Sequence, residues 1–284
     1  MALLEKTITD NVVDFTPSLI FFDIDGTLLD TKGNYSQRLE RELKRLAGLG
    51  VKLAIASGRP AIAAQFLFDN LPLTDAGLFC TGAEIYHPKQ KQHIQTHCLS
   101  TEDIGCLYDR VKQQKLYCEF YTYDFYTAGN NTDIASIHSQ HLRVKPKIIS
   151  AQDFFKQNIP ITKLLLGVDN HTHKGALEKL AAEFSHLEFA FAHFLARPDW
   201  YFASVVSPLA NKEKGFKQLL NYHKVSADQV MAFGDSQSDS VFIQQAGMGV
   251  AMGNANEALK GLANVTTLSA DEDGVAVLLS KLLT

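Results

Sequence analysis

Short apolar runs and amphipathic segments alternate along the first part of the chain. Apolar runs of strand length occupy residues 19–22, 51–56 and 77–80. Between the first two, leucines recur at helical spacing on one face, namely Leu39, Leu43, Leu46 and Leu49. Pro60 can stand at the first position of a second helix, which runs through Leu71. This alternation predicts a parallel α/β sheet.

The same alternation returns near the end of the chain. Apolar runs at residues 230–233, 248–252 and 265–268 predict three more strands. Helical patterns lie between them, at residues 238–246 and 257–262. We therefore expect both ends of the chain to contribute to one Rossmann-like parallel sheet.

The middle of the chain reads differently. Residues 116–128 are rich in aromatic side chains in alternation, which predicts a sheet with one covered face. Further strands are predicted at residues 161–168, 187–194 and 200–206, and helices at residues 100–114 and 173–184. Helices that cover one face of a largely antiparallel sheet account for this pattern.

We therefore predict two domains. Residues 1–84 and 208–284 form the α/β core, and residues 85–207 form an α+β domain inserted into it. No internal repeat or low-complexity segment complicates this division.

Composition narrows the possible functions. The chain has 284 residues, of which 46% are hydrophobic, enough for one large core or two modest ones. Its net charge of -4, without a basic run, disfavours nucleic-acid binding. No apolar stretch reaches the roughly 18 residues of a membrane span.

Two further features favour a cytoplasmic location. Residues 1–14 lack a basic start followed by an apolar region, and so do not read as a secretory signal. The four cysteines form no C-x-x-C pair, and they are Cys80, Cys98, Cys106 and Cys118. We expect them to be buried free thiols rather than a disulfide or zinc framework.

Chemistry-bearing residues follow the predicted strands of the core. The segments are Asp23-Ile24-Asp25-Gly26-Thr27, Ser57-Gly58-Arg59 and Gly234-Asp235-Ser236-Gln237-Ser238-Asp239. A fourth candidate, Lys212, comes just before a predicted helix. Because ligand sites in open α/β sheets form outside the carboxyl ends of the strands, we expect these groups to meet in one crevice.

The inventory of this crevice points to phosphoryl transfer. Asp23 and Asp25 lie on the same side if the strand continues that far, because alternate residues of a strand share a face. Clustered carboxylates repel one another unless a hard cation such as Mg²⁺ lies among them. Lysine, a serine hydroxyl and backbone N–H groups suit the oxygens of a phosphate.

These motifs, in this order, resemble those of the haloacid dehalogenase superfamily of phosphotransferases, and within it the Cof-like phosphatases. Residues 81–85, 246–255 and 273–276 also resemble segments of that family. The spacing supports the match: about 155 residues separate Ser57 from Lys212, far more than the core needs. The resemblance implies that this insertion is the larger α/β cap of the family.

The resemblance implies a role for each aspartate. Asp23 is the nucleophile that forms an aspartyl-phosphate, and Asp25 is the general acid and then the general base. The Asp23 carboxylate, the backbone carbonyl of Asp25 and Asp235 hold Mg²⁺. Asp239 supports the metal directly or through a water.

The resemblance also assigns the phosphate-binding groups. They are Ser57, Gly58, Lys212, Gly26 and Thr27. The charge of the lysine offsets the crowd of negative charge around the transferring group.

Three positions depart from the family pattern. Ser238 stands where asparagine is common, Thr81 where asparagine is often found, and Ser204 where glutamate is frequent in the last cap strand. The first change concerns the surroundings of the metal, and the other two concern contacts between cap and substrate.

Several residues keep a second interpretation. Arg59 is either a substrate or cap contact, or a structural ion pair. Ser57 could cap the helix that follows it, and Lys214 competes for the role of the phosphate-binding lysine. His171 and His173 invite a zinc site, but a polar turn is favoured because no partner ligands stand at a fitting spacing.

We predict a soluble Mg²⁺-dependent phosphatase of a small phosphorylated metabolite, with a sugar phosphate as the favoured class. The rivals are a phosphomutase of the same fold, similar to phosphomannomutase, and a non-catalytic phosphometabolite-binding protein. The match of residues 247–254 to hydrolytic Cof-like proteins disfavours the first, and the complete set of aspartates disfavours the second. Neither the substrate nor the oligomeric state follows from the sequence.

Overall fold

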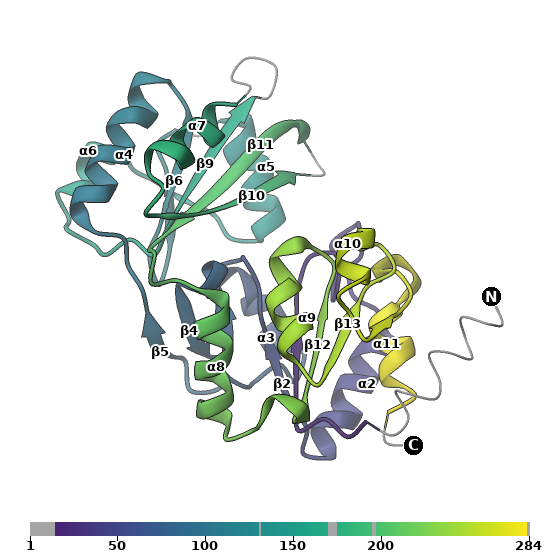
Figure 1. Cartoon of the computed structure of the whole chain (residues 1–284). Helices are drawn as coiled ribbons and strands as arrows, with labels where there is room; N and C mark the ends of the chain where they lie inside the picture. The colour runs from purple at the N-terminus through teal and green to yellow at the C-terminus, as the bar shows by residue number, and fades with distance from the viewer. Residues whose placement is uncertain (1–14, 131, 170–174, 195–196, 283–284) are drawn as a thin grey trace.

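The computed structural model describes residues 15–130, 132–169, 175–194 and 197–282. These residues form two lobes, a core built from both ends of the chain and a cap built from its middle (Figure 1). The predicted α/β fold, with a parallel core sheet and an inserted cap, is therefore confirmed. The zinc alternative at His171 and His173 falls outside the described residues.

The core is organised around a five-stranded sheet. In spatial order its strands are β14 (Val265–Thr266), β13 (Met248–Ala251), β12 (Val230–Gly234), β1 (Leu19–Phe22) and β2 (Lys52–Ile55). All neighbouring pairs are parallel. The interior strand β1 is buried over its whole length, which explains its uninterrupted apolar sequence.

Helices cover both faces of this sheet. They are α2 (Gln37–Gly48), α3 (Gln65–Asn70), α8 (Lys212–His223), α9 (Ser240–Gln245), α10 (Glu257–Lys260) and α11 (Gly274–Leu279). Ile20 and Phe22 of β1 pack toward α2, α3 and α11, whereas Leu19 and Phe21 pack toward α8 and α9. The period-two alternation of the strand thus divides the core into two apolar layers.

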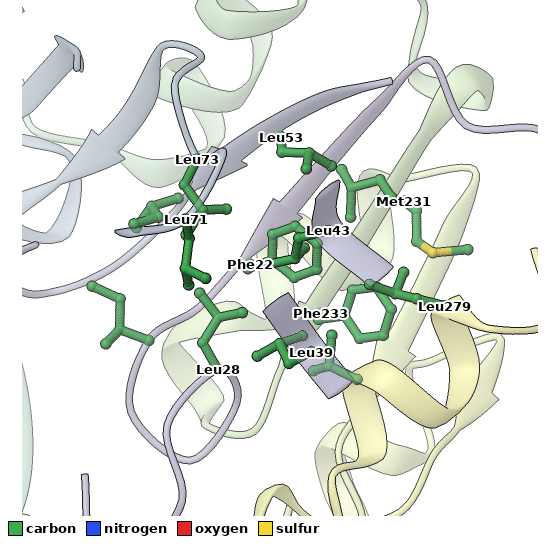
Figure 2. Packing of buried hydrophobic residues seen from close by; sticks show 14 of the residues in the cluster. Phe22, Leu28, Leu39, Leu43, Leu53, Leu71, Leu73, Met231, Phe233 and Leu279 are labelled. Atoms are coloured by element: carbon green, nitrogen blue, oxygen red, sulfur yellow. The ribbon is translucent and has the colours of Figure 1, made fainter. Parts of the chain in front are cut away.

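The layer beneath α2 shows how tightly these elements fit (Figure 2). Phe22 of β1 and Phe233 of β12 stack with ring centroids 5.3 Å apart. Leu39 and Leu43 pack against them from α2, whose first turn is held because the Ser36 hydroxyl accepts from the Leu39 N–H at 2.9 Å. Truncation of fully buried Leu43 to alanine costs about 2–5 kcal/mol.

A small antiparallel sheet leads from the core toward the cap. Its strands are β3 (Gly77–Phe79), β4 (Glu84–His87) and β5 (Gln92–Thr96). A parallel bridge between Ala56 and Leu78 places β3 next to β2. The turn between β3 and β4 contains Thr81 and Gly82 at φ +58° and +107°.

The cap contains a six-stranded mixed sheet. In spatial order its strands are β10 (Glu188–Phe194), β11 (Arg197–Val206), β9 (Lys163–Asp169), β6 (Tyr117–Tyr121), β7 (Tyr126–Ala128) and β8 (Lys147–Ile148). Every pair is antiparallel except β7 with β8. The cap helices are α4 (Thr101–Gln113), α5 (Asp133–Leu142), α6 (Ala151–Phe155) and α7 (Ala176–Glu183).

The two faces of the cap sheet have different neighbours. One face is covered by α4, α6 and α7, with Leu164 and Leu166 of β9 among the buried residues. The opposite face carries Leu165 and packs against α5 and against Ala63 of the core. The cap sheet therefore meets the core through α5 and through its own second face.

Several expectations need correction. Residues 60–71 form a 3₁₀ turn, Ala61–Ala64, followed by the short helix α3, rather than one continuous helix. The apolar pattern did not indicate α5, α6 or β5. All four cysteines are free, but of the four only Cys80 is buried, since Cys98 and Cys118 are partly buried and Cys106 is exposed. Among the described residues, no helix has the length and apolar character needed to cross a bilayer.

Candidate functional site

The sequence-predicted segments converge at one edge of the core sheet. Asp23 and Asp25 follow β1, Ser57 follows β2, and Asp235 follows β12. These three strands are adjacent and parallel, and their register aligns Phe22 with Ile55 and with Phe233. Their carboxyl ends therefore open onto the same crevice.

Three carboxylates form the centre of this crevice. One oxygen from each of Asp23, Asp235 and Asp239 lies within 4.8 Å of the other two. Burial, together with the neighbouring negative charges, raises the pKa of Asp23 well above its ordinary value and that of Asp235 to about 7. The cluster therefore lacks enough positive charge of its own to stay fully ionised at neutral pH.

Gly26 lets the first motif turn beneath this cluster. Its φ is +74°, and a Cβ placed there would lie 2.3 Å from Oδ2 of Asp235. Asn254, in the loop after β13, holds the Gly26 turn next to Asp235. Its amide donates to the Gly26 carbonyl at 2.9 Å and to Asp235 Oδ2 at 3.0 Å. Sequence reasoning included Asn254 only as part of a matching stretch, and not as a site residue.

Asp239 organises the loop that carries Asp235. Its Oδ2 accepts from the backbone N–H groups of Asp235 and Ser236, at 3.2 and 3.0 Å. The hydroxyl of Ser238, which stands where the family commonly has asparagine, donates to Oδ1 at 3.2 Å. Serine at that position therefore keeps a hydrogen bond to the buried carboxylate.

Lys212 brings a buried cation to the cluster. Its Nζ donates to the Ser238 carbonyl at 2.7 Å and lies 3.4 Å from Asp239 Oδ1. The side chain is only 8% exposed, whereas Lys214 is exposed. The geometry thus favours Lys212 over Lys214 as the cation of the site.

The loop after β2 adds small polar groups. Ser57 is buried, and its hydroxyl accepts from the Arg59 N–H at 3.3 Å rather than capping a helix. The carbonyl of Gly58 accepts from Lys163 of the cap at 3.3 Å. Thr27 is also buried, and its hydroxyl has no hydrogen-bond partner among the described residues.

Arg59 links the segment that follows β2 to the segment that follows β1. Its guanidinium donates to both carboxylate oxygens of Asp25, at 2.7 and 2.6 Å. Burial alone would raise the pKa of Asp25, but the hydrogen bonds and the charge of Arg59 outweigh it and lower that pKa. Nη2 of the same guanidinium also lies 3.3 Å from Nε2 of His141 on α5. Arg59 is therefore both an ion-pair partner and a contact of the cap.

Other side chains join cap and core around the site. Lys163 of β9 lies over the Tyr121 ring, 4.3 Å from its centroid, while it donates to Gly58. Arg143, at the end of α5, donates to the Gly33 carbonyl at 2.5 Å and covers the Phe66 ring. No sequence pattern indicates these contacts, because they depend on how the cap docks.

A separate cavity of about 590 Å³ lies within the cap. Its lining includes Tyr117, Trp200 and Arg197, and none of the sequence-predicted site residues. The clustered carboxylates therefore belong to the crevice at the edge of the core sheet, and not to this cavity.

Comparison with known proteins agrees with this geometry. Residues 20–279 match the sequence profile of the haloacid dehalogenase-like hydrolases. The chain belongs to the haloacid dehalogenase-like hydrolase family. The resemblance drawn from the motifs is therefore confirmed.

Curated relatives and solved structures extend the match over nearly the whole chain. Phosphatase YwpJ of Bacillus subtilis is 27% identical over 93% of this chain and 99% of its own length. The 5-amino-6-(5-phospho-D-ribitylamino)uracil phosphatase YitU of the same organism is 29% identical, over 92% of this chain and 95% of its own. A haloacid dehalogenase-like hydrolase from Bacteroides thetaiotaomicron superposes with a TM-score of 0.81 at 28% identity, covering 94% and 99% of the two chains. The protein is thus a phosphatase of this family, a phosphoric monoester hydrolase acting on small phosphometabolites.

Proposed function

We propose that this chain is a Mg²⁺-dependent phosphatase that hydrolyses a phosphorylated sugar or sugar alcohol through an aspartyl-phosphate at Asp23. The observation that carries the proposal is the set of Asp23, Asp235 and Asp239 beside buried Lys212 at the carboxyl edge of the sheet. A phosphate ester needs both kinds of group, a nucleophilic carboxylate and positive charge around the transferring oxygens.

The donor set fits Mg²⁺. Three carboxylates converge within 4.8 Å, and burial together with their mutual repulsion raises the pKa values of Asp23 and Asp235, an unfavourable charge arrangement that a hard cation would relieve. We assign Asp23, Asp235 and the backbone carbonyl of Asp25 as ligands. Asp239 would support them, since its Oδ2 already accepts from the backbone N–H of Asp235. When bound, the metal would neutralise the carboxylates and the phosphate.

Asp23 and Asp25 divide the chemistry between them. Asp23 is buried at the carboxyl edge of the sheet, and its carboxylate is the group that attacks phosphorus. Asp25 carries the proton, first to the leaving oxygen and then from the attacking water. Arg59 lowers the pKa of Asp25, and the negative charge of a bound phosphate ester would oppose this effect during the first step. Without that ester, Arg59 keeps Asp25 ionised and ready to act as the base.

The remaining predicted residues bind the phosphoryl group. Lys212 supplies charge, and the buried hydroxyls of Ser57 and Thr27 supply hydrogen bonds. Gly26 and Gly58 lie in the loops that follow β1 and β2, and the Gly26 N–H holds its loop by donating to the Leu29 carbonyl at 3.1 Å. The unpartnered hydroxyl of Thr27 is a donor that a phosphate oxygen would satisfy.

The substrate class rests on the relatives and on the cap. YitU is named for a phosphorylated ribitylamino compound, which is a sugar-alcohol phosphate. We keep residues 85–207 as the substrate-selecting cap and residues 1–84 and 208–284 as the catalytic core. We also propose a cytoplasmic location, because the exposed thiol of Cys106 suits a reducing compartment.

The test is release of inorganic phosphate from p-nitrophenyl phosphate and a panel of sugar and sugar-alcohol phosphates with Mg²⁺. Asp23→Asn is expected to abolish turnover, while the matched surface variant Asp153→Asn retains it. Activity that survives in Asp23→Asn contradicts the mechanism. Substrate loss without free phosphate would instead indicate a mutase, and binding without turnover would indicate a non-catalytic protein.

A further inference from the structure

Helix α5 carries two histidines toward the core on one face. His138 and His141 are three positions apart, and such residues are neighbours on a helix surface. Their rings lie nearly parallel, with centroids 6.3 Å apart and an interplanar angle of 20°. Ile134 and Leu142 of the same helix pack in a cluster that includes Ala63 of the core. The helix is therefore placed to carry a contact from the cap to the core.

His138 fixes the helix to the cap sheet. Its Nδ1 lies 2.9 Å from a carboxylate oxygen of Glu119, which is fully buried on β6. The hydroxyls of Tyr117 and Tyr121 donate to the same carboxylate, each at 2.5 Å. The His138 ring also stacks on Phe202 of β11, with centroids 6.1 Å apart. Both tyrosines lie on β6 with Glu119, so among these donors His138 is the one that ties α5 to the buried carboxylate.

His141, one helical turn further, reaches the catalytic crevice. Its Nε2 lies 3.3 Å from Nη2 of Arg59 and 3.7 Å from Oδ1 of Asp25. Because a guanidinium can only donate, Nε2 of His141 must be the acceptor. The same Nη2 donates to Asp25 Oδ1 at 2.6 Å, so its two N–H groups serve one core carboxylate and one cap imidazole.

We propose that His141 is a positioning residue that holds Arg59, and through it Asp25, in the orientation needed for proton transfer to the leaving oxygen. The inference rests on the proposed function, in which Asp25 is the general acid. Arg59 can donate to His141 only while the cap covers the core, because His141 belongs to the cap. Cap closure therefore completes the alignment of the acid, in addition to excluding water.

The test compares two esters of similar shape and different leaving-group basicity. Phenyl phosphate releases a basic phenolate that needs a proton, whereas p-nitrophenyl phosphate releases a much weaker base. In His141→Leu, kcat/KM for phenyl phosphate is expected to fall about tenfold more than kcat/KM for p-nitrophenyl phosphate. The comparison uses kcat/KM because this ratio reports the steps up to formation of the aspartyl-phosphate. Hydrolysis of that intermediate comes later and is the same for both esters.

Two variants separate positioning from a general effect on the fold. His141→Gln keeps an acceptor at a similar reach and is expected to recover most of the loss. His186→Leu makes the same apolar change at an exposed cap histidine paired with Asp103, and is expected to leave both esters unaffected. If His141→Leu melts below the assay temperature, His141→Asn, whose amide is too short to reach Arg59, replaces it.

The outcomes distinguish this inference from the proposed function. Equal losses for the two esters, or a glutamine variant no better than leucine, overturn the role of His141. Wild-type protein that releases no phosphate from either ester contradicts the proposed function itself. A normal wild type whose ester ratio is unchanged in His141→Leu overturns the role of His141 alone.

Discussion

The guanidinium of Arg59 engages both carboxylate oxygens of Asp25, with Nε to Oδ2 at 2.7 Å and Nη2 to Oδ1 at 2.6 Å. The two residues follow different strands, β1 and β2, and meet only because those strands are adjacent. The arginine is 6% exposed and the aspartate 44% exposed. The pair therefore presents a carboxylate to the crevice from a buried, rigid cation, a geometry that the planar fork of arginine supplies and lysine does not.

Replacement of Arg59 by lysine tests this pair. Lysine keeps the charge but loses the two parallel hydrogen bonds, so the pKa of Asp25 is expected to rise toward its ordinary value. Asp25 then loses its proton at higher pH, and the limb of the kcat/KM profile that reports this ionisation shifts to higher pH. Arg110→Lys, in an exposed pair with Glu183, is the control. An unchanged profile in Arg59→Lys would show that the fork does not set this pKa.

Gly26→Ala is expected to damage the site more than the fold. The backbone at φ +74° costs alanine about 1–2 kcal/mol, and its Cβ would meet Asp235 Oδ2 at 2.3 Å. Displacement of that carboxylate by about 1 Å is expected to lower kcat about 100-fold. Gly50→Ala is the matched control, since φ there is +86° with no atom within 4 Å. Both variants are expected to lose similar stability in thermal melts. Equal activity in the two would refute the role of the close approach between Gly26 and Asp235.

The carboxylate cluster predicts how Mg²⁺ and pH act together on stability. The pKa of Asp235 rises from an ordinary 3.8 to about 7 in the folded, metal-free protein, so the folded state retains a proton that the unfolded chain has released. Stability from this group is therefore present at low pH and is lost as pH rises from about 4 to 7.

A cation that binds only the folded carboxylates offsets that loss. The increase in Tm on adding Mg²⁺ is therefore expected to be larger at about pH 8 than at about pH 5. Asp235→Asn is expected to abolish most of the difference. A Tm increase that is the same at both pH values would speak against metal binding at this cluster.

A buried histidine far from the crevice predicts a separate loss of stability in acid. His223 on α8 donates from Nε2 to the Ala76 carbonyl at 2.8 Å, and burial lowers its pKa below the ordinary 6.5. Below that value the unfolded chain takes up a proton that the folded state resists, so stability falls as pH drops through about 6.5 toward the folded pKa.

Chemical denaturation between about pH 7 and pH 5 measures this loss. His223→Gln cannot ionise but can still donate, and is expected to lose less stability over the same interval than the wild type. His186→Gln, at an exposed site, is expected to follow the wild type. Identical slopes for His223→Gln and the wild type would exclude the contribution.

The parts of the site predicted from the sequence share a physical origin. Asp23, Ser57 and Asp235 each come directly after an apolar run, and parallel strands bring such positions to one edge. Asn254 also follows a strand, but an asparagine beside glycine is equally typical of a turn, so its contacts with Gly26 and Asp235 were not foreseen.

Contributions from the cap lie beyond what sequence periodicity can indicate. α5 buries few apolar residues, Ile134, Ala135 and Leu142, so its pattern was too weak to predict a helix. His141 and Lys163 reach the core only because the cap docks with this face toward it. A contact between domains depends on their relative placement, which local propensity does not encode.

Lys163, Arg143 and His141 of the cap make polar contacts with the core that differ in what they require of it. Lys163 and Arg143 donate to the carbonyls of Gly58 and Gly33, and any residue offers a backbone carbonyl. His141 differs from them, because its polar contact is with a particular core side chain, that of Arg59. During divergence or recombination among relatives, a cap of different specificity could therefore replace this one with few compensating changes in the core. The histidine and the arginine are a pair expected to be inherited, or lost, together.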